Sequence, residues 1–314
     1  MTAPLDSARR GERTTHWGNV GEAGFAAGTW ILYFIQRYLG RWPFRVALAP
    51  VLLFYVLTAR LARASSREYL TRLGLPSSFR TTYLHIGAFA ESLMDKTMAV
   101  SGRFPFHTLR FTGREVMLDS MARKQGGVLV TAHMGCLEVC RLAAERKDGP
   151  KLNVLVHTRH AERFNSVLQR LDPHSQVKLI QVTDVSPATA ALLAEKVDAG
   201  EFVVITADRV PLSDSTGRTV AAPFLGRTAY FPIGPWVLAS ALKCQVIMFS
   251  VNREDDTYRA RFEKLAERVE LPRGKREEAA AGYVARYAQK LEQLCRESPY
   301  DWFNFFPFWE PPRA

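Results

Sequence analysis

Short apolar segments typical of strands alternate with segments of helical periodicity from residue 126 onward. The strand candidates are Val128–Ala132, Leu152–His157, Val177–Val182 and Phe202–Ala207. Successive strands separated by helices pair in parallel, and the helices then cover both faces of the sheet. The alternation therefore predicts an α/β fold. Ligand sites on such sheets gather at the carboxyl ends of the strands.

The end of the chain departs from this strict alternation. Helices are predicted over Pro235–Leu242 and Arg276–Arg296, a loop over residues 211–226, and a strand over Cys244–Val251 with Thr257–Phe262 paired beside it. We therefore expect a central sheet that is mixed but mostly parallel and is covered by helices. In the final stretch, Pro299 to Pro312, seven of 14 residues are aromatic. That tail either covers the core or forms the mouth of an apolar channel.

Residues 1–80 differ from the rest of the chain in charge. They hold 11 arginines, no lysine and four acidic residues, so that 11 − 4 gives +7 of the chain's net +11. Two uncharged runs of 14 residues, Ala23–Gln36 and Val46–Ala59, lie among the arginines. As helices each run covers about 21 Å, less than the roughly 30 Å of a hydrocarbon core, and Pro50 would kink the second run.

We therefore expect residues 1–80 to form an apolar and basic helical segment that lies in one leaflet of a membrane, followed by an α/β domain over residues 81–314. Arginines would reach the lipid phosphates, and aromatic side chains such as Trp30 and Trp42 would sit at the depth of the headgroups. The alternative is a helical subdomain packed on the core, with its arginines in solvent.

The composition excludes several classes of protein. No stretch approaches the roughly 20 uninterrupted apolar residues of a spanning helix, which excludes a polytopic membrane protein. Four scattered cysteines without a CxxC pair exclude a disulfide framework and a zinc ribbon, and they favour a reducing, cytoplasmic setting. The chain has no zinc finger, basic zipper or RNP-like motif, so we expect no nucleic-acid partner. The N-terminus lacks the order of a signal peptide, so we expect it to be retained.

The candidate catalytic residues are His133 and Glu138, which lie five positions apart after the first strand candidate. Within one continuous helix five residues turn through about 500°, so the two side chains converge only if His133 precedes the helix in a turn, which Gly135 permits. Glu138 would then accept a proton from one imidazole nitrogen and leave the other as a general base, with helix N-terminal amides stabilising an oxyanion. The alternative is a core histidine that caps a helix.

Other catalytic patterns are absent from the sequence. It has no GxSxG nucleophile elbow and no HExxH zinc motif. Cys136 is flanked by Leu137 and Val139, which indicates a packed side chain rather than a nucleophile. The attacking group is therefore expected to be a hydroxyl of the substrate.

The segment Gly126–Glu138, with two glycines, an apolar strand and His-x4-Glu, resembles the first block of the lysophospholipid acyltransferase superfamily. Within it, the chain is most similar to the bacterial branch of late lauroyl and myristoyl acyltransferases of lipid A. Further blocks follow in the family's order: Val156–Arg159 with Asn165, Ala207–Arg209, Gly217–Gly226 with Phe224, and Pro232–Gly234. Together the similar segments span about residues 17–312.

The resemblance implies acyl transfer from an acyl carrier protein thioester to a lipid hydroxyl, without a metal or other cofactor. The implied partners are the carrier protein (or coenzyme A as donor), the lipid acceptor and an anionic membrane surface. An acidic carrier protein also suits a chain of net charge +11. His133 would be the base and Glu138 its orienting carboxylate. The implied substrate contacts are Arg159, Asn165, Asp208, Arg209, Gly217, Phe224, Gly226 and Pro232. Surface ion pairs for the two arginines and a loop cap for Asp208 are the alternatives.

Two departures separate the chain from the lipid A enzymes. Met134–Leu137 stands where they usually carry Asn-Trp, and Tyr300–Trp309 stands in place of their Trp-x-His-Arg-Arg-like ending. This ending and Trp17–Gly24 are similar to acyltransferases found with aryl polyene pigment pathways. The similarity implies an aryl polyene lipid as acceptor, and a peripheral or monotopic enzyme on the cytoplasmic side of a bacterial inner membrane. A lipid A acceptor and a non-catalytic lipid-binding protein are the alternatives.

Overall fold

The computed structural model describes residues 22–104, 109–139, 149–156, 178–181, 187–210, 219–254 and 257–311. Most of Trp17–Gly24 therefore lies outside the described residues. The chain divides into two compact units, residues 1–49 and residues 50–314. This division falls upstream of the boundary expected near residue 80. That boundary stays a prediction.

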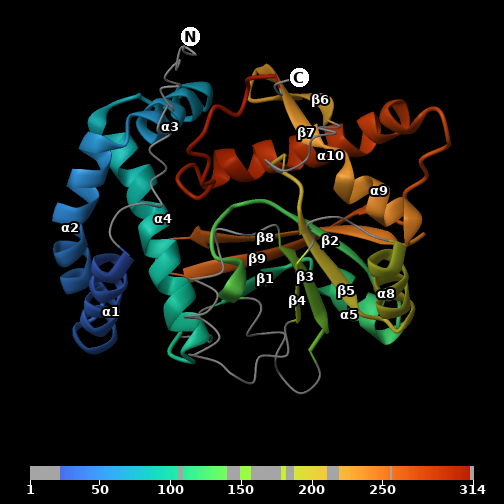
Figure 1. Ribbon diagram of the computed structural model, residues 1–314, viewed down its shortest axis with the longest axis horizontal. Helices are drawn as coiled ribbons and strands as arrows, with labels where there is room; N and C mark the ends of the chain where they lie inside the picture. Colours follow the sequence, from blue (N-terminus) through green and yellow to red (C-terminus); the bar gives the residue numbers. More distant parts are fainter. Residues whose placement is uncertain are drawn as a thin grey trace, which may run out of the picture. The chain divides into compact units, whose positions relative to one another are not determined.

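A seven-stranded sheet in the order β1-β9-β8-β2-β5-β3-β4 forms the centre of the second unit (Figure 1). Its strands are β1 (Arg110–Thr112), β2 (Gly127–Thr131), β3 (Leu152–Val156), β4 (Lys178–Gln181), β5 (Phe202–Thr206), β8 (Gln245–Glu254) and β9 (Thr257–Ala266). Every neighbouring pair is parallel except β8 and β9, which run antiparallel. The predicted mixed but mostly parallel sheet is confirmed.

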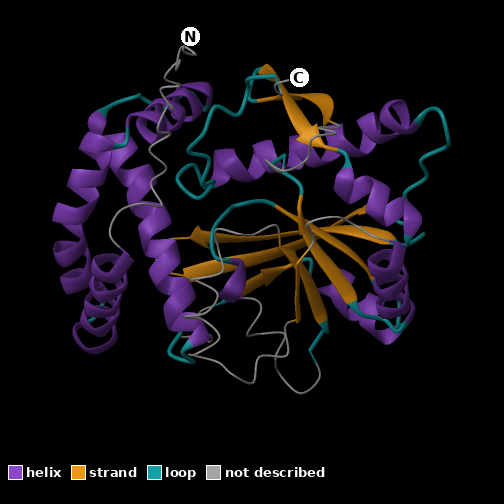
Figure 2. Ribbon diagram, viewed as in Figure 1, coloured by secondary structure: helices purple, strands orange, loops and turns teal. Residues whose placement is uncertain are grey.

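Helices lie on both sides of this sheet, as Figure 2 shows. They are α3 (Arg60–Arg72), α4 (Phe79–Val100), α5 (Arg114–Ala122), α8 (Pro187–Asp198), α9 (Gly234–Ala241) and α10 (Arg276–Glu297). The side chains of β2 alternate between two cores, because successive residues of a strand point to opposite faces. Val128 and Val130 join a core with α9 and α10, whereas Leu129 joins a core with α4 and α5. All five residues of β2 are buried, which explains why the strand is apolar throughout.

The region predicted as a loop contains a β-hairpin, so that part of the prediction is wrong. Strands β6 (Thr219–Phe224) and β7 (Arg227–Pro232) pair antiparallel around the two-residue turn Leu225–Gly226. Both turn residues have positive φ, 48° and 76°, as a tight hairpin turn requires. Leucine rarely adopts this conformation, which hid the turn in the sequence. The Glu292 carboxylate supports it by accepting the Leu225 N–H at 2.6 Å.

The N-terminal helices are longer than the uncharged runs that predicted them. Helices α1 (Glu22–Leu39) and α2 (Arg41–Thr58) each have 18 residues, and α2 continues through Pro50 as one helix. Among the described residues, α2 is the one helix long and apolar enough to cross a membrane by length and composition. The length expected from the sequence counted only the uncharged residues Val46–Ala59. Helix α2 begins earlier, at Arg41, and includes Arg45.

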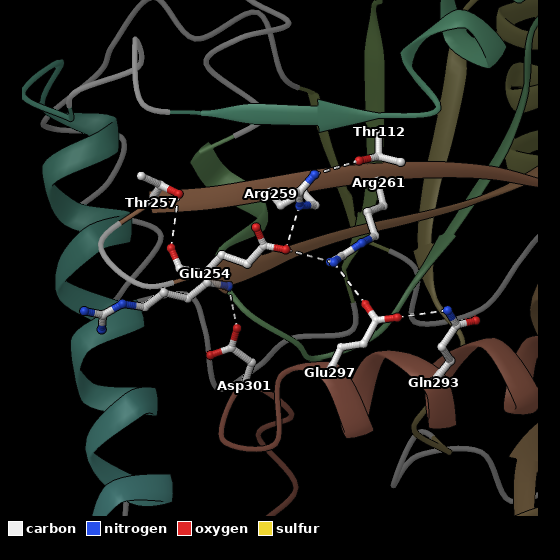
Figure 3. A network of polar contacts seen from close by, with 9 residues as sticks. Thr112, Glu254, Thr257, Arg259, Arg261, Gln293, Glu297 and Asp301 are labelled. Carbon is white, nitrogen blue, oxygen red and sulfur yellow. Dashed lines mark hydrogen bonds and ion pairs between the residues drawn. The ribbon is translucent and has the colours of Figure 1, made fainter.

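A network of charged side chains joins the edge of the sheet to the end of α10 (Figure 3). The Arg259 side chain donates to Glu254 Oε1 at 2.6 Å and to Thr112 Oγ1 at 3.2 Å. Arg261 donates to the same Glu254 oxygen at 3.1 Å and pairs with Glu297 at 3.0 Å. Strands β1, β8 and β9 are thereby tied to the point where α10 leads into the aromatic tail.

Asp301, which follows α10, is a buried acid whose ionisation opposes folding. Burial raises the pKa of Asp301 from 3.8 to about 6, although the N–H and the charge of Arg253 act in the opposite direction. A raised folded-state pKa gives stability that is present at low pH and is lost as the pH rises.

We predict that the wild-type chain loses unfolding free energy relative to Asp301→Asn as the pH rises from about 4 to about 6. The loss should be about 3 kcal/mol at most, since one pKa unit corresponds to about 1.4 kcal/mol. The asparagine oxygen can still accept the Arg253 N–H, which Asp301 accepts at 2.5 Å. Urea unfolding of both proteins between pH 4 and 8 measures the difference. A difference that stays constant with pH would contradict the prediction.

Candidate active site

His133 and Asp208 meet at the carboxyl edge of the sheet because β2 and β5 are parallel neighbours. Thr131 is in register with Thr206, and these residues end their strands. His133 and Asp208 each follow two residues later. Thr131 O accepts the Ala207 N–H at 2.9 Å, and Asp208 Oδ2 accepts the His133 N–H at 2.9 Å. The other carboxylate oxygen, Oδ1, lies 2.8 Å from His133 Nδ1.

The Asp208 carboxylate is ionised although it is only 1% exposed. Burial by itself would raise the pKa of Asp208, but the charge and hydrogen bonds of His133, with the charge of Arg209, outweigh it and lower the pKa to about 2. Oδ2 also accepts the indole N–H of Trp302 at 3.1 Å. A buried carboxylate with several N–H donors keeps its charge for this reason.

The state of Asp208 fixes the proton on the imidazole. An ionised carboxylate only accepts hydrogen bonds, so His133 Nδ1 carries the proton and Nε2 keeps its lone pair. The His133 side chain is 36% exposed, and within the described part of the chain Nε2 has no hydrogen-bond partner. The arrangement leaves Nε2 able to accept a proton at the edge of the sheet.

The aromatic tail forms one wall of the site. Met134 pairs with Trp302 in an isolated antiparallel bridge, and His133 O accepts the Phe303 N–H at 2.9 Å. Asp301 O accepts the Gly135 N–H at 2.9 Å. Gly135 has φ +57°, and a Cβ there would lie 1.6 Å from Val251 O, so only glycine fits. The predicted turn at Gly135 is confirmed.

Glu138 does not orient the imidazole, and the predicted contact between His133 and Glu138 is wrong. The Glu138 carboxylate forms an ion pair with Lys96 of α4, and the Cys136 thiol lies 4.0 Å from its other oxygen. The reason is that bonds to Val251 O and Asp301 O fix the loop before Glu138. The loop turns Glu138 toward α4, while the imidazole turns toward Asp208.

Cys136 lies in the core, as its apolar neighbours predict. It is 1% exposed, and burial, reinforced by the charge of Glu138, raises the pKa of the thiol well above its ordinary value. The thiol therefore stays protonated. Its backbone N–H is bonded to Val251 O at 3.2 Å, and that of Gly135 to Asp301 O. These two amides are therefore not available to stabilise an oxyanion, and a contribution from the amides that follow stays a prediction.

The structure places four of the remaining predicted substrate contacts, whereas Arg159, Asn165 and Gly217 lie outside the described residues. Arg209 is half-buried, donates from Nη2 to Phe303 O at 2.6 Å, and lies with its guanidinium 5.3 Å from the centre of the Phe306 ring. Its Nε has no hydrogen-bond partner among the described residues. Arg209 thus holds the tail against the strand end that carries Asp208.

The other three residues belong to the hairpin. Phe224 is fully buried with its ring 5.3 Å from that of Trp302, Gly226 lies in the turn, and Pro232 is paired with Thr219 at the hairpin's open end. Phe224 thus packs against Trp302, and the contact of these three residues with substrate stays a prediction. Within the described ranges, no group of three or more His, Cys, Asp or Glu side chains is arranged to hold a metal ion.

The family of the chain follows from comparison with known proteins. The family model of the bacterial lipid A biosynthesis acyltransferases matches residues 85–310, well over half of the 314 residues. The chain belongs to this family. None of the curated proteins compared with it matches. The protein is accordingly an acyltransferase of lipid biosynthesis.

We predict that Asp208→Asn, but not Glu138→Gln, changes the protonation pattern of the His133 ring. An asparagine amide no longer favours a proton on Nδ1 as a carboxylate does, so the share of the Nε2–H tautomer should rise clearly. Nitrogen-15 spectra of histidine-labelled protein measure the tautomer, and His133→Ala assigns the signal. A change of tautomer in Glu138→Gln but not in Asp208→Asn would contradict the prediction and would identify Glu138 as the orienting carboxylate.

Proposed function

We propose that this enzyme moves an acyl group from an acyl carrier protein thioester to a hydroxyl of a lipid acceptor, with His133 as general base and Asp208 as its orienting carboxylate. The observation that carries the proposal is the Nδ1-anchored imidazole, whose Nε2 is left without a partner in the described structure. Family membership supplies the reaction class and the lipid acceptor.

The reaction is proposed to run in one ternary complex. Nε2 of His133 takes the hydroxyl proton as the acceptor oxygen attacks the thioester carbonyl, and the imidazolium gives that proton to the departing thiolate as the tetrahedral intermediate collapses. The buried charge of Asp208, 2.8 Å from Nδ1, stabilises the imidazolium in between. A protonated, buried Cys136 argues against an acyl-enzyme.

The carrier protein is proposed as donor on the basis of charge. A chain of net charge +11 is complementary to an acidic partner, and such complementarity raises association rates. Coenzyme A thioesters are the alternative donor. For the acceptor, the departures at Met134–Leu137 and Tyr300–Trp309 favour an aryl polyene lipid over lipid A.

We propose that the N-terminal helices bind the cytoplasmic face of a bacterial inner membrane. Large apolar side chains are exposed along them: Trp30, Ile31, Phe34, Tyr38, Leu39, Trp42 and Val46 in the first unit, and Val51, Leu53, Phe54, Leu57 and Leu61 in the second. Exposed apolar surface of this extent is typical of a membrane or protein interface. Arginines between these side chains suit anionic headgroups.

We predict that His133→Ala lowers the turnover of acyl transfer by roughly 10² or more, the contribution of a lost general base. Cys136→Ala is the matched control and should stay active, because its thiol is buried away from the reaction. The assay follows acyl transfer from carrier-protein and coenzyme A thioesters to extracted lipids by mass spectrometry. Normal turnover of His133→Ala would overturn the mechanism, and an acyl adduct on Cys136 with donor alone would overturn the ternary complex.

We predict that replacing Arg37, Arg41, Arg45 and Arg60 by glutamine lowers binding to anionic vesicles by at least about tenfold, since each basic residue near such a surface contributes about 1 kcal/mol. Arg63 is left unchanged because its guanidinium donates to the carbonyl of Val56 at the end of α2. The control replaces four exposed basic residues of the second unit, Arg268, Arg273, Lys275 and Arg276.

Vesicle flotation with anionic and neutral lipids measures this binding. High salt should release only part of the wild-type protein, because it shortens the Debye length from about 10 Å at 0.1 M to about 3 Å at 1 M but leaves the apolar contribution. Loss of binding in the control alone would place the membrane contact elsewhere. A wild-type chain that floats with neither lipid would contradict membrane binding by these helices.

A further inference from the structure

A second histidine, His85 of α4, is buried and is linked through Trp302 to the pair formed by His133 and Asp208, here called the catalytic pair. Its Nδ1 is 2.9 Å from the hydroxyl of Ser66 in α3, and its Nε2 is 2.8 Å from the backbone oxygen of Trp302. Ser66 and His85 are both completely buried. Two helices and the C-terminal tail, distant in sequence, therefore meet at one imidazole.

The roles of donor and acceptor in this group are fixed by its chemistry. Burial lowers the pKa of His85 to about 4, although the bond to Trp302 acts in the opposite direction, so the ring is neutral at physiological pH. The Trp302 carbonyl only accepts, so Nε2 carries the proton and Nδ1 accepts from the Ser66 hydroxyl. Ser66 has no access to a substrate, which excludes a second nucleophilic site.

Trp302 connects His85 to the catalytic pair. The backbone oxygen of Trp302 accepts from His85, while its indole N–H donates to Asp208 Oδ2 at 3.1 Å. Its backbone also pairs with Met134, next to His133. A shift of this one residue would move the indole donor from the carboxylate that anchors His133 Nδ1.

Ring contacts restrain the indole of Trp302, whereas its backbone is held by the bridge to Met134 and by the hydrogen bond from His85. Tyr69, Phe224 and Phe308 surround the indole with ring centroids at 5.0, 5.3 and 4.8 Å and interplanar angles of 65°, 75° and 86°. Such contacts restrain the plane of a ring but are weakly directional. The hydrogen bond from His85 is directional, and it acts on the backbone that carries the indole.

We propose that His85, whose ring is oriented by Ser66, is a positioning residue that fixes Trp302 and, through its indole, the Asp208 carboxylate behind His133. The consequence for turnover rests on the proposed acyl transfer, whereas the placement of Trp302 does not. The competing role is packing alone, since the His85 ring also lies 5.1 Å from Tyr69 and 4.9 Å from Phe305.

Three variants separate positioning from packing. His85→Phe keeps an aromatic ring but removes the donor to Trp302 O. His85→Gln places an amide N–H near the position of Nε2 and should restore the donor. Ser66→Ala removes only the partner of Nδ1. Ser120→Ala, which deletes a buried hydroxyl bonded to Gln245 on the other side of the sheet, is the matched control for lost stability.

The experiment records the indole N–H resonance of Trp302 in tryptophan-labelled full-length protein, assigned with Trp302→Phe, together with kcat, KM and thermal stability. We expect His85→Phe to shift the resonance and to lower kcat about tenfold with little change in KM. His85→Gln should recover kcat to within about threefold of wild type, Ser66→Ala should fall between them, and Ser120→Ala should leave the resonance unchanged.

Packing alone would be established if His85→Phe lowered thermal stability but left the indole resonance and kcat unchanged. If His85→Phe fails to fold, Ser66→Ala decides, and an unshifted resonance there overturns the proposal. Failure of the proposed function is a different outcome, because a wild-type protein without acyl transfer still gives the indole resonance. In that case the resonance in the variants tests the placement of Trp302 by itself.

Discussion

The structure around the site depends on the buried negative charge of Asp208. Removing a carboxylate from water costs several kcal/mol unless donors and positive charge replace the solvent. Here two donors come from His133 and a third from Trp302, while Arg209 adds positive charge. His133 follows β2, Arg209 follows β5, and Trp302 belongs to the C-terminal tail. Satisfying one carboxylate therefore requires that β2 and β5 end at the same level and that the tail return across them.

Local features of the fold were predictable, whereas partners across the sheet were not. The strand before His133 and the turn at Gly135 follow from residues within a short window. The partner of the imidazole does not, because it depends on β5 lying next to β2. The paired residues Thr131 and Thr206 are 75 positions apart in the sequence. Proximity in the sequence suggested Glu138 as the partner of the imidazole, whereas the order of the strands in the sheet brings Asp208 to it. The turn at Leu225 escaped prediction because a distant glutamate supports it.

The aromatic tail has a packing role and a polar role at once. The sequence left open whether this tail covers the core or lines a channel. Trp302, Phe308 and Trp309 are buried, and Trp302 and Phe308 lie in ring contact with Phe224 of the hairpin, so these three side chains cover the core. Tryptophan combines a large apolar ring with one N–H donor, so a single residue can close the core and bond the carboxylate. No pattern of aromatic spacing distinguishes that donor from its neighbours.

Helix α4 binds Glu138, which does not contact the His133 ring. Four residues in one stretch of α4 bind the loop and strands next to the site: Glu91 pairs with Arg253, Ser92 donates to Gly135 O, Asp95 accepts from Tyr258, and Lys96 pairs with Glu138. Glu138 and Gly135 are thus two points at which the loop after His133 is bonded to α4. His85 lies on the same helix, seven residues before Ser92. Helix α4 therefore bonds the loop after His133 through Ser92 and bonds Trp302 through His85. The imidazole is held by Asp208, and the backbone that presents it is held by α4.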